Sequence, residues 1–170
     1  RMKSGELPMP PMAEVMGMHP DVAEHGRVVF TSTPKAAFLN PMGTIHAGYA
    51  LTLLDTVLAC TVHSTLAAGQ TYTTLEVKAN FVRAILPDSG LLTIEGKILS
   101  AGRRIGTSEA KITDAKGRLL AHATRHALFS RAIRLCGDCE SPFAGFTLGM
   151  DCLILADAQN AGVGETSLFL

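Results

Sequence analysis

The longest apolar stretch of the chain lies over residues 47–67 and repeats with the period of a helix. In "AGYALTLLDTVLACTVHSTLA", apolar side chains occupy nearly every side of a helical wheel, which is typical of a helix that is buried on most sides. Gly69 follows at a position where helices commonly end. The pattern therefore predicts a central helix over about 47–67, closed by Gly69.

After Gly69 the period changes from helical to two. The run "TYTTLEVKANFVR" alternates apolar and polar residues, which predicts a half-buried antiparallel strand. The alternation places two sets of side chains on opposite faces: Leu75, Val77, Ala79 and Phe81 on one, and Thr74, Glu76, Lys78 and Asn80 on the other.

Three more alternating runs follow, separated by "PDSG", "AGRR" and "DAKG", and short turns of this kind are hairpin signals. Before the helix, "GRVVFTSTP" predicts one further strand, ended by Pro34. Residues 1–25 begin with a Met- and Pro-rich stretch that has no period and predict an irregular arm. We assign residues 26–130 to one domain and residues 131–170, which have no clean alternation, to an extension of unknown role.

A sheet with one apolar face needs a cover, and the helix over 47–67 is the only candidate. The expected class is α+β, with a curved antiparallel sheet wrapped around one long helix. The helix is apolar on its remaining side as well, and a partner subunit is the simplest cover for that side.

Composition narrows the classes of function. The charges of fifteen basic and fifteen acidic residues cancel in a chain of 170 residues with a pI of about 7.2. The chain therefore lacks the net positive charge that is typical of nucleic-acid-binding proteins. No apolar run reaches the ~20 residues of a membrane span, and the start lacks a secretory signal pattern; we expect a cytoplasmic protein. Cys60 is expected to be a buried thiol, and the isolated Cys136–Cys139 pair is not expected to bind metal.

Asp55 is the candidate for chemistry, because a carboxylate among leucines is costly unless it is paired or hydrogen-bonded and such groups are often functional. The alternative is that Asp55 lies on a solvent-exposed strip of the helix, or that its carboxylate accepts hydrogen bonds from Thr52 or Thr56. Gly48 and other small residues leave room beside Asp55 for a substrate. The turn over 43–48 supplies free backbone N–H groups at the helix start, where a carbonyl oxygen can gain negative charge.

The Asp55 carboxylate and the start of the helix at His46 cannot act on one substrate within one chain. Nine residues separate His46 from Asp55, which corresponds to a rise of about 13 Å and opposite directions on the helix. If both are catalytic, the site joins Asp55 of one subunit to the helix start of another, which requires a symmetric dimer.

The pattern N-x-x-G-x-x-H-x-G followed by "LLD", together with the order strand, helix and four strands, resembles the hotdog-fold acyl-CoA thioesterases of the PaaI (phenylacetate-degradation) type. The resemblance covers about residues 26–129. It implies a homodimer or a homotetramer built as a dimer of dimers, with the active site at a subunit interface.

The resemblance also implies roles for individual residues. Asp55 matches the catalytic carboxylate, as nucleophile or as general base, and the choice stays open. The side chain of Asn40 helps to hold the thioester or the attacking water, and His46 is an orienting residue. The backbone N–H of Ala47 polarises the thioester C=O, although the family usually has glycine there. Thr74 matches a Ser or Thr that assists across the site.

Arg103 and Arg104 in "AGRRIG" resemble a basic pair of the family that meets the phosphates of CoA; a solvated turn is the alternative. His122 and His126 share a strand face but lack a third ligand, so no metal is expected there.

The hypothesis is therefore hydrolysis of aryl or medium-chain acyl-CoA thioesters to free acid and CoA, without metal or redox cofactor. A non-catalytic acyl-CoA binding or sensing hotdog domain is the alternative. A hydratase or dehydratase is disfavoured, since it would place its acid and histidine together.

Overall fold

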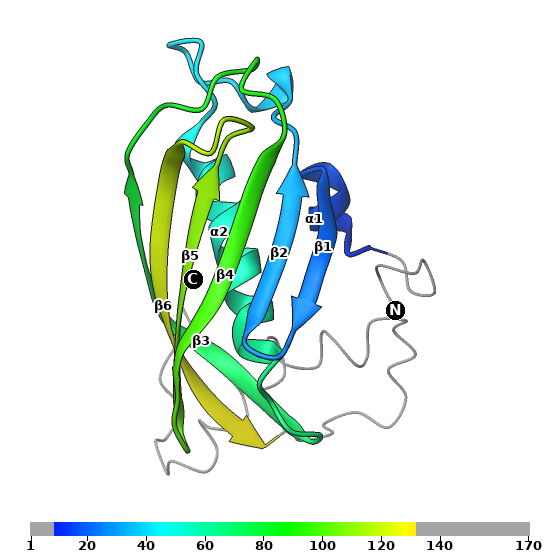
Figure 1. Ribbon diagram of the computed structural model, residues 1–170, viewed down its shortest axis with the longest axis vertical. Coiled ribbons are helices and arrows are strands. Elements are labelled where there is room, and N and C mark those ends of the chain that lie inside the picture. Colours follow the sequence, from blue (N-terminus) through cyan, green and yellow to red (C-terminus); the bar gives the residue numbers. More distant parts are fainter. Residues whose placement is uncertain (1–8, 132–170) are drawn as a thin grey trace, which may run out of the picture.

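The computed structural model describes residues 9–131, which form a curved antiparallel sheet lying against one long helix (Figure 1). The elements are α1 (Pro11–Val15), β1 (Met18–Glu24), β2 (Arg27–Ser32), the 3₁₀ turn η1 (Ala36–Phe38), α2 (Ala47–His63), β3 (Gln70–Phe81), β4 (Leu92–Ala101), β5 (Ile105–Thr113) and β6 (Leu119–Arg131). The strand order is β1-β2-β4-β5-β6-β3. The predicted α+β class is confirmed; the extension from residue 132 onward, with its CGDC sequence, lies outside the described residues.

The core lies between α2 and the sheet. One side of α2 is fully buried, and it meets the inward side chains of the central strands, all of them aliphatic: Leu53, Leu54, Val57, Leu58, Leu92, Ile94 and Ile112. Along the other side of α2 runs an exposed strip of Ala47, Leu51 and Asp55. Between residues 9 and 131, no helix is long and apolar enough to cross a membrane.

The helix is shorter than its apolar pattern predicted: α2 ends at His63 and not near residue 67. The hydroxyl of Ser64 donates to the C=O of Thr61 at 2.7 Å and accepts the N–H of Gly26 at 2.9 Å. These bonds tie the end of α2 to the β1–β2 hairpin. Gly69, with φ of 80°, lies in the turn that leads into β3.

The expected N-terminal arm contains two regular elements. Within its described part, α1 packs Ala13 into the core and β1 pairs with β2 along the sheet edge. The alternation of β1 is interrupted by Pro20, and its register shifts between Pro20 and Val22. An edge strand accommodates proline and a bulge, which is why the period was not visible in the sequence.

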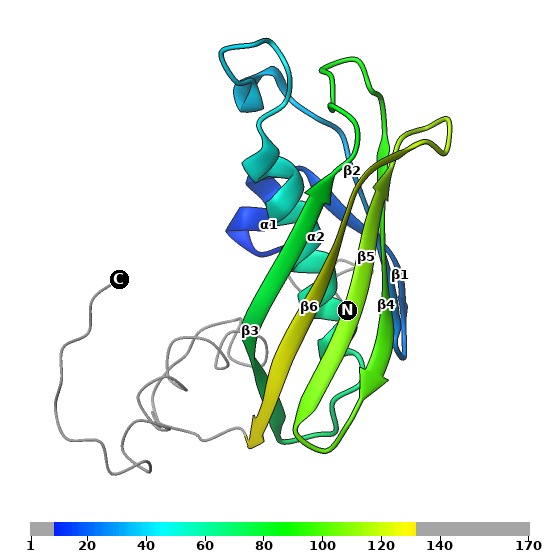
Figure 2. The same ribbon diagram turned by 90° about the vertical axis from the view of Figure 1, so that its left-hand side faces the viewer.

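The prediction that Thr74 and Val77 point to opposite faces of β3 is wrong, because β3 contains a bulge. The register with β6 shifts between Thr74 and Glu76, so Thr74 pairs with Ala127 while Val77 pairs with Arg125. Directly paired residues point to the same side of a sheet, and the extra residue Leu75 changes the alternation. Thr74 therefore shares the helix-facing side with Val77 and does not lie opposite it. Figure 2 shows β3 as the outermost strand, beside β6 and next to α2.

Candidate active site

The start of α2 presents one unpaired backbone donor. His46 is the N-cap residue, and its Nδ1 accepts the N–H of Gly48 at 2.9 Å. The N–H of Tyr49 donates to the C=O of His46 at 3.0 Å. The N–H of the exposed Ala47 has no acceptor among residues 9–131. Because helix N-termini carry partial positive charge, this N–H is suited to a carbonyl oxygen that becomes negative.

The residue types at positions 47 and 48 follow from this geometry. Ala47 is the first residue of α2, and a right-handed helical backbone suits alanine as well as glycine, so the departure from the family pattern does not obstruct the helix. A Cβ at Gly48 would lie 2.9 Å from Nδ1 of His46. The space at Gly48, predicted to admit a substrate, is occupied in this structure by the His46 ring.

Asn40 shapes the loop that leads into α2. Its Oδ1 accepts the backbone N–H groups of Met42 at 2.9 Å and Thr44 at 3.2 Å, and its Nδ2 donates to the hydroxyl of Thr44 at 2.8 Å. Asn40, Thr44 and Ala47 also line a pocket of about 230 Å³ together with residues 81–85. Ala47, which carries the free N–H, is thus one of the residues that line this pocket.

Asp55 lies in the middle of α2 with its side chain 52% exposed. The hydroxyls of Thr52 and Thr56 donate to the backbone carbonyls of Gly48 and Thr52, so the expected alternative in which they donate to Asp55 is wrong. Instead, Nη1 of Arg125 donates to Oδ1 of Asp55 at 3.2 Å. The carboxylate is therefore paired and still open to solvent.

Arg125 is the residue that the sequence prediction missed. It lies on β6 with 2% of its surface exposed, and its guanidinium carbon lies 5.2 Å from the centre of the Tyr72 ring. Burial raises the pKa of Tyr72 to about 12, against the opposing effect of the Arg125 charge. A signal was present in the sequence, because Ala121, Ala123 and Ala127 alternate on the inward face and Arg125 takes the remaining inward position.

The predicted site residues fall into separate places in one chain. Ala47 and Asp55 are eight residues apart along α2, a rise of about 12 Å, which no single carbonyl group spans. Thr74 faces the helix side of β3, and the Glu76–His126 pair separates its own pair with Ala127 from the Val77–Arg125 pair. Arg103 and Arg104 are exposed in the β4–β5 turn, at the end of the sheet away from the start of α2 (Figure 1).

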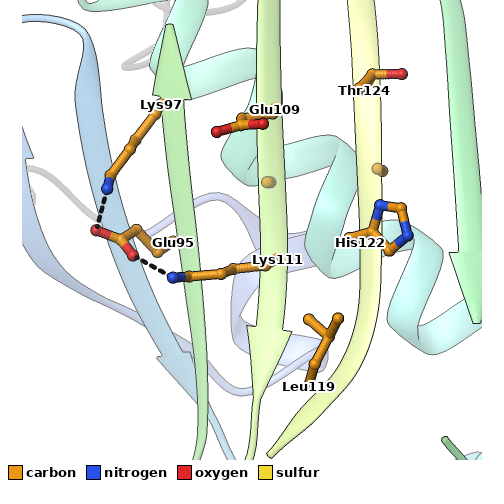
Figure 3. Close-up of a pocket in the computed structure, with 9 residues that line it drawn as sticks. Glu95, Lys97, Glu109, Lys111, Leu119, His122 and Thr124 are labelled. Atoms are coloured by element: carbon orange, nitrogen blue, oxygen red, sulfur yellow. Dashed lines mark ion pairs between the residues drawn. The ribbon is translucent and has the colours of Figure 1, made fainter. Parts of the chain in front are cut away.

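The outer face of the sheet, which points away from α2, carries charged side chains. A pocket of about 360 Å³ lies over β4, β5 and β6, and Figure 3 shows Glu95 paired with Lys97 at 3.7 Å and Lys111 at 3.2 Å. His122 lines this pocket, and His126 is exposed on the same face. The part of the chain that the structure describes holds no group of three side chains able to bind a metal ion. The charges balance, and none of the predicted site residues lies there.

Comparison with known proteins fits this arrangement. Residues 42–121 match the thioesterase superfamily. A hypothetical thioesterase of Streptococcus pneumoniae TIGR4, solved with coenzyme A, is 30% identical with a TM-score of 0.61, over 67% of this chain and 86% of that one. A phenylacetic acid degradation-related protein of Ralstonia eutropha JMP134 is 29% identical with a TM-score of 0.69, over 75% of this chain and 96% of that one.

A protein of Streptococcus mutans UA159, solved with acetyl-CoA, is 25% identical with a TM-score of 0.62, over 67% of this chain and 89% of that one. A search among curated protein sequences finds no match. The fold and these similarities show that the protein is a thioester hydrolase with the hotdog fold. The chain belongs to the thioesterase superfamily and is of the PaaI type.

Proposed function

We propose that this protein hydrolyses acyl-CoA thioesters, with aryl or medium-chain acyl groups, to the free acid and CoA. The observation that carries the proposal is the pair of groups that α2 presents: the unpaired N–H of Ala47 and the half-exposed carboxylate of Asp55. The relatives solved with coenzyme A and with acetyl-CoA support the CoA moiety.

The chemistry follows from these two groups. The N–H of Ala47 donates to the thioester oxygen as it gains negative charge. In one route, Asp55 takes a proton from a water whose oxygen bonds to the carbonyl carbon; in the other, the Asp55 carboxylate attacks that carbon and water then cleaves the anhydride. In both, the C–S bond breaks and the thiolate of CoA leaves and is protonated. Asn40 and Thr74 hold the water or thioester, and His46 orients the helix start.

A second copy of the chain completes this site in the proposal, as a dimer or a dimer of dimers. Within one chain the two groups are about 12 Å apart, so Asp55 of one copy would act with the Ala47 N–H of another. β3 is an edge strand of the sheet that residues 9–131 form, and Leu75 and Phe81 in it and Val82 just after it are each at least half exposed. A strand edge with exposed apolar side chains suits pairing with another chain.

Substrate contacts of Arg103 and Arg104 with CoA phosphates are part of the same proposal, supported by the exposure of both residues in a turn. The acyl group would lie in the pocket lined by residues 81–85. No metal or redox cofactor is required, because a thioester carbonyl is activated enough for a carboxylate and a backbone dipole.

The test is release of free thiol from a panel of acyl-CoAs by the wild type and by Asp55→Asn. We expect Asp55→Asn to lose turnover by a factor of about 10² or more. Asp88→Asn, in the exposed turn after residue 86, is the matched control and should retain full turnover. Equal turnover by Asp55→Asn would remove the catalytic role of that residue.

Binding of acyl-CoA without turnover by the wild type would favour the non-catalytic alternative. Sedimentation equilibrium checks the shared site separately. A protein that turns over acyl-CoA as a strict monomer would contradict the two-copy arrangement.

A further inference from the structure

Arg125 is a charged side chain in the core of a small domain. It is 2% exposed and is the largest of the fully buried side chains in residues 9–131. Burial of a guanidinium is costly unless opposite charge and hydrogen bonds compensate it. The compensation here is incomplete, because its Nε has no hydrogen-bond partner among the described residues.

Both hydrogen bonds that Arg125 donates within residues 9–131 go to one residue, Asp55. Nη1 donates to Oδ1 of Asp55 and to the backbone C=O of Asp55, each at 3.2 Å. From β3, the ring of Tyr72 packs against the guanidinium, and on α2 the Cys60 thiol lies near enough for the Arg125 charge to lower its pKa in part. Asp55 is the one carboxylate that forms an ion pair with Arg125 in the described chain.

A second Arg–Asp pair in the same molecule, Arg118 with Asp114, can be compared with the pair of Arg125 and Asp55. In the pair of Arg118 with Asp114, the acid is 2% exposed and the arginine 53% exposed. Both oxygens of Asp114 are used: Oδ1 accepts two backbone N–H groups, and Oδ2 accepts from the guanidinium at 2.7 Å. That pair stabilises a turn.

The pair of Arg125 with Asp55 has the reverse arrangement. The arginine is buried and the acid is presented to solvent, and only Oδ1 of Asp55 accepts a hydrogen bond within the described residues. Oδ2 stays free. Because Arg125 holds both the backbone oxygen and one carboxylate oxygen of the same residue, rotation of the carboxylate is restricted.

We propose that Arg125 is a positioning residue, which fixes Asp55 through Oδ1 and directs Oδ2 toward the thioester or its attacking water. This inference rests on the proposed function of Asp55. Fixing a reacting group in advance removes part of the entropic cost of the transition state, so the effect of Arg125 appears in kcat rather than in KM.

The experiment is a double-mutant cycle with Arg125→Met and Asp55→Asn, measured as kcat and KM for thiol release. We expect Arg125→Met to lower kcat by about 10- to 100-fold with KM changed less than about threefold, as loss of alignment does. In the Asp55→Asn background, Arg125→Met should cause no further loss, because the residue acts through Asp55. Arg125→Lys should keep part of the activity, since it retains a cation but loses the planar fork.

Arg118→Met is the matched control: it breaks the other Arg–Asp pair, and we expect kcat to stay at the wild-type value. An equal loss of kcat from Arg125→Met in both backgrounds overturns the inference, because a purely structural residue behaves in that way. If Arg125→Met does not fold, the same cycle with Arg125→Lys decides by the same criterion. Turnover lost in Asp55→Asn but retained in Arg125→Met overturns this inference alone, whereas full turnover in Asp55→Asn overturns the proposed function.

Discussion

The imidazole of His46 caps α2 across the open face of Gly48. Nδ1 of His46 accepts the N–H of Gly48 at 2.9 Å, and a Cβ on residue 48 would lie at the same 2.9 Å from that nitrogen. The ring and a side chain at residue 48 therefore exclude each other. Glycine at this position allows the cap, and the cap leaves the N–H of Ala47 as the free donor.

A substitution at Gly48 tests this exclusion. Gly48→Ala should displace the His46 ring and lower the free energy of unfolding by about 1 kcal/mol, the usual effect of losing an N-cap, measured by urea unfolding. In a His46→Ala background the same change should be neutral or stabilising by up to about 1 kcal/mol, because alanine is the better helix former once no ring is present. A loss of equal size in both backgrounds would contradict the relationship.

Proline at position 47 removes the proposed oxyanion donor and little else. The first position of a helix tolerates proline, and His46 already has the extended backbone, with ψ of 137°, that precedes a proline. Ala47→Pro should keep the fold by circular dichroism and lower kcat by about 10²- to 10³-fold, as removal of an oxyanion donor does. Ala47→Gly keeps the N–H and should keep turnover; wild-type kcat in Ala47→Pro would rule out this donor.

Gly96 of β4 lies directly against α2. A Cβ there would lie 2.8 Å from Cγ1 of Val57, and it would also overlap the hydroxyl of Thr61. Gly96→Ala should therefore push the helix from the sheet and destabilise the protein by about 1–3 kcal/mol, the usual range for overpacking. Ser100→Ala, at an exposed position of the same strand, should change the unfolding free energy by less than about 0.5 kcal/mol.

Asp114 should make stability fall in acid. Burial raises its pKa, but the backbone N–H groups of Arg118 and Lys116 and the Arg118 guanidinium outweigh burial, so the pKa of Asp114 is below its ordinary value. A carboxyl with a lowered pKa contributes stability that is full above the unfolded pKa of about 3.9 and is lost as pH falls through the folded value.

Urea unfolding at several values between pH 7 and pH 2.5 measures this loss. Asp114→Asn should be less stable than the wild type at pH 7 and should show a flatter decline below about pH 4. Asp88→Asn, in an exposed turn, serves as the control and should follow the wild-type curve. Parallel curves for Asp114→Asn and the wild type would exclude Asp114 as the source.

Cys60 should react slowly with thiol reagents. It was expected to be buried and is partly buried against the core; this burial raises its pKa to about 11, against the opposing charge of Arg125. Since the thiolate is the reactive form, alkylation at pH 8 should leave Cys60 largely unmodified in the folded protein and should be complete in urea. Peptide-resolved mass spectrometry separates Cys60 from the other three cysteines, and rapid native labelling would contradict its burial.

The hotdog arrangement could be predicted from the sequence because its signals are local. A helical period, alternating strands and short polar turns each depend on residues close together in the chain, and the N-x-x-G-x-x-H-x-G pattern places Asn40, His46 and Ala47 within one turn and one helix start. Asp55 could be singled out for the same reason, as an acid within an apolar helical run.

Only the tertiary structure decided the features that join distant segments. The hydroxyl of Ser64 meets Gly26 and marks the end of α2; the bulge at Leu75 brings Thr74 to the helix side of the sheet. Asp55 meets Arg125, seventy residues further along the chain. No periodicity encodes such pairings, because they depend on strand register and on how closely α2 packs on the sheet. The sequence determined the elements and the candidate acid, and tertiary packing determined which side chain holds that acid.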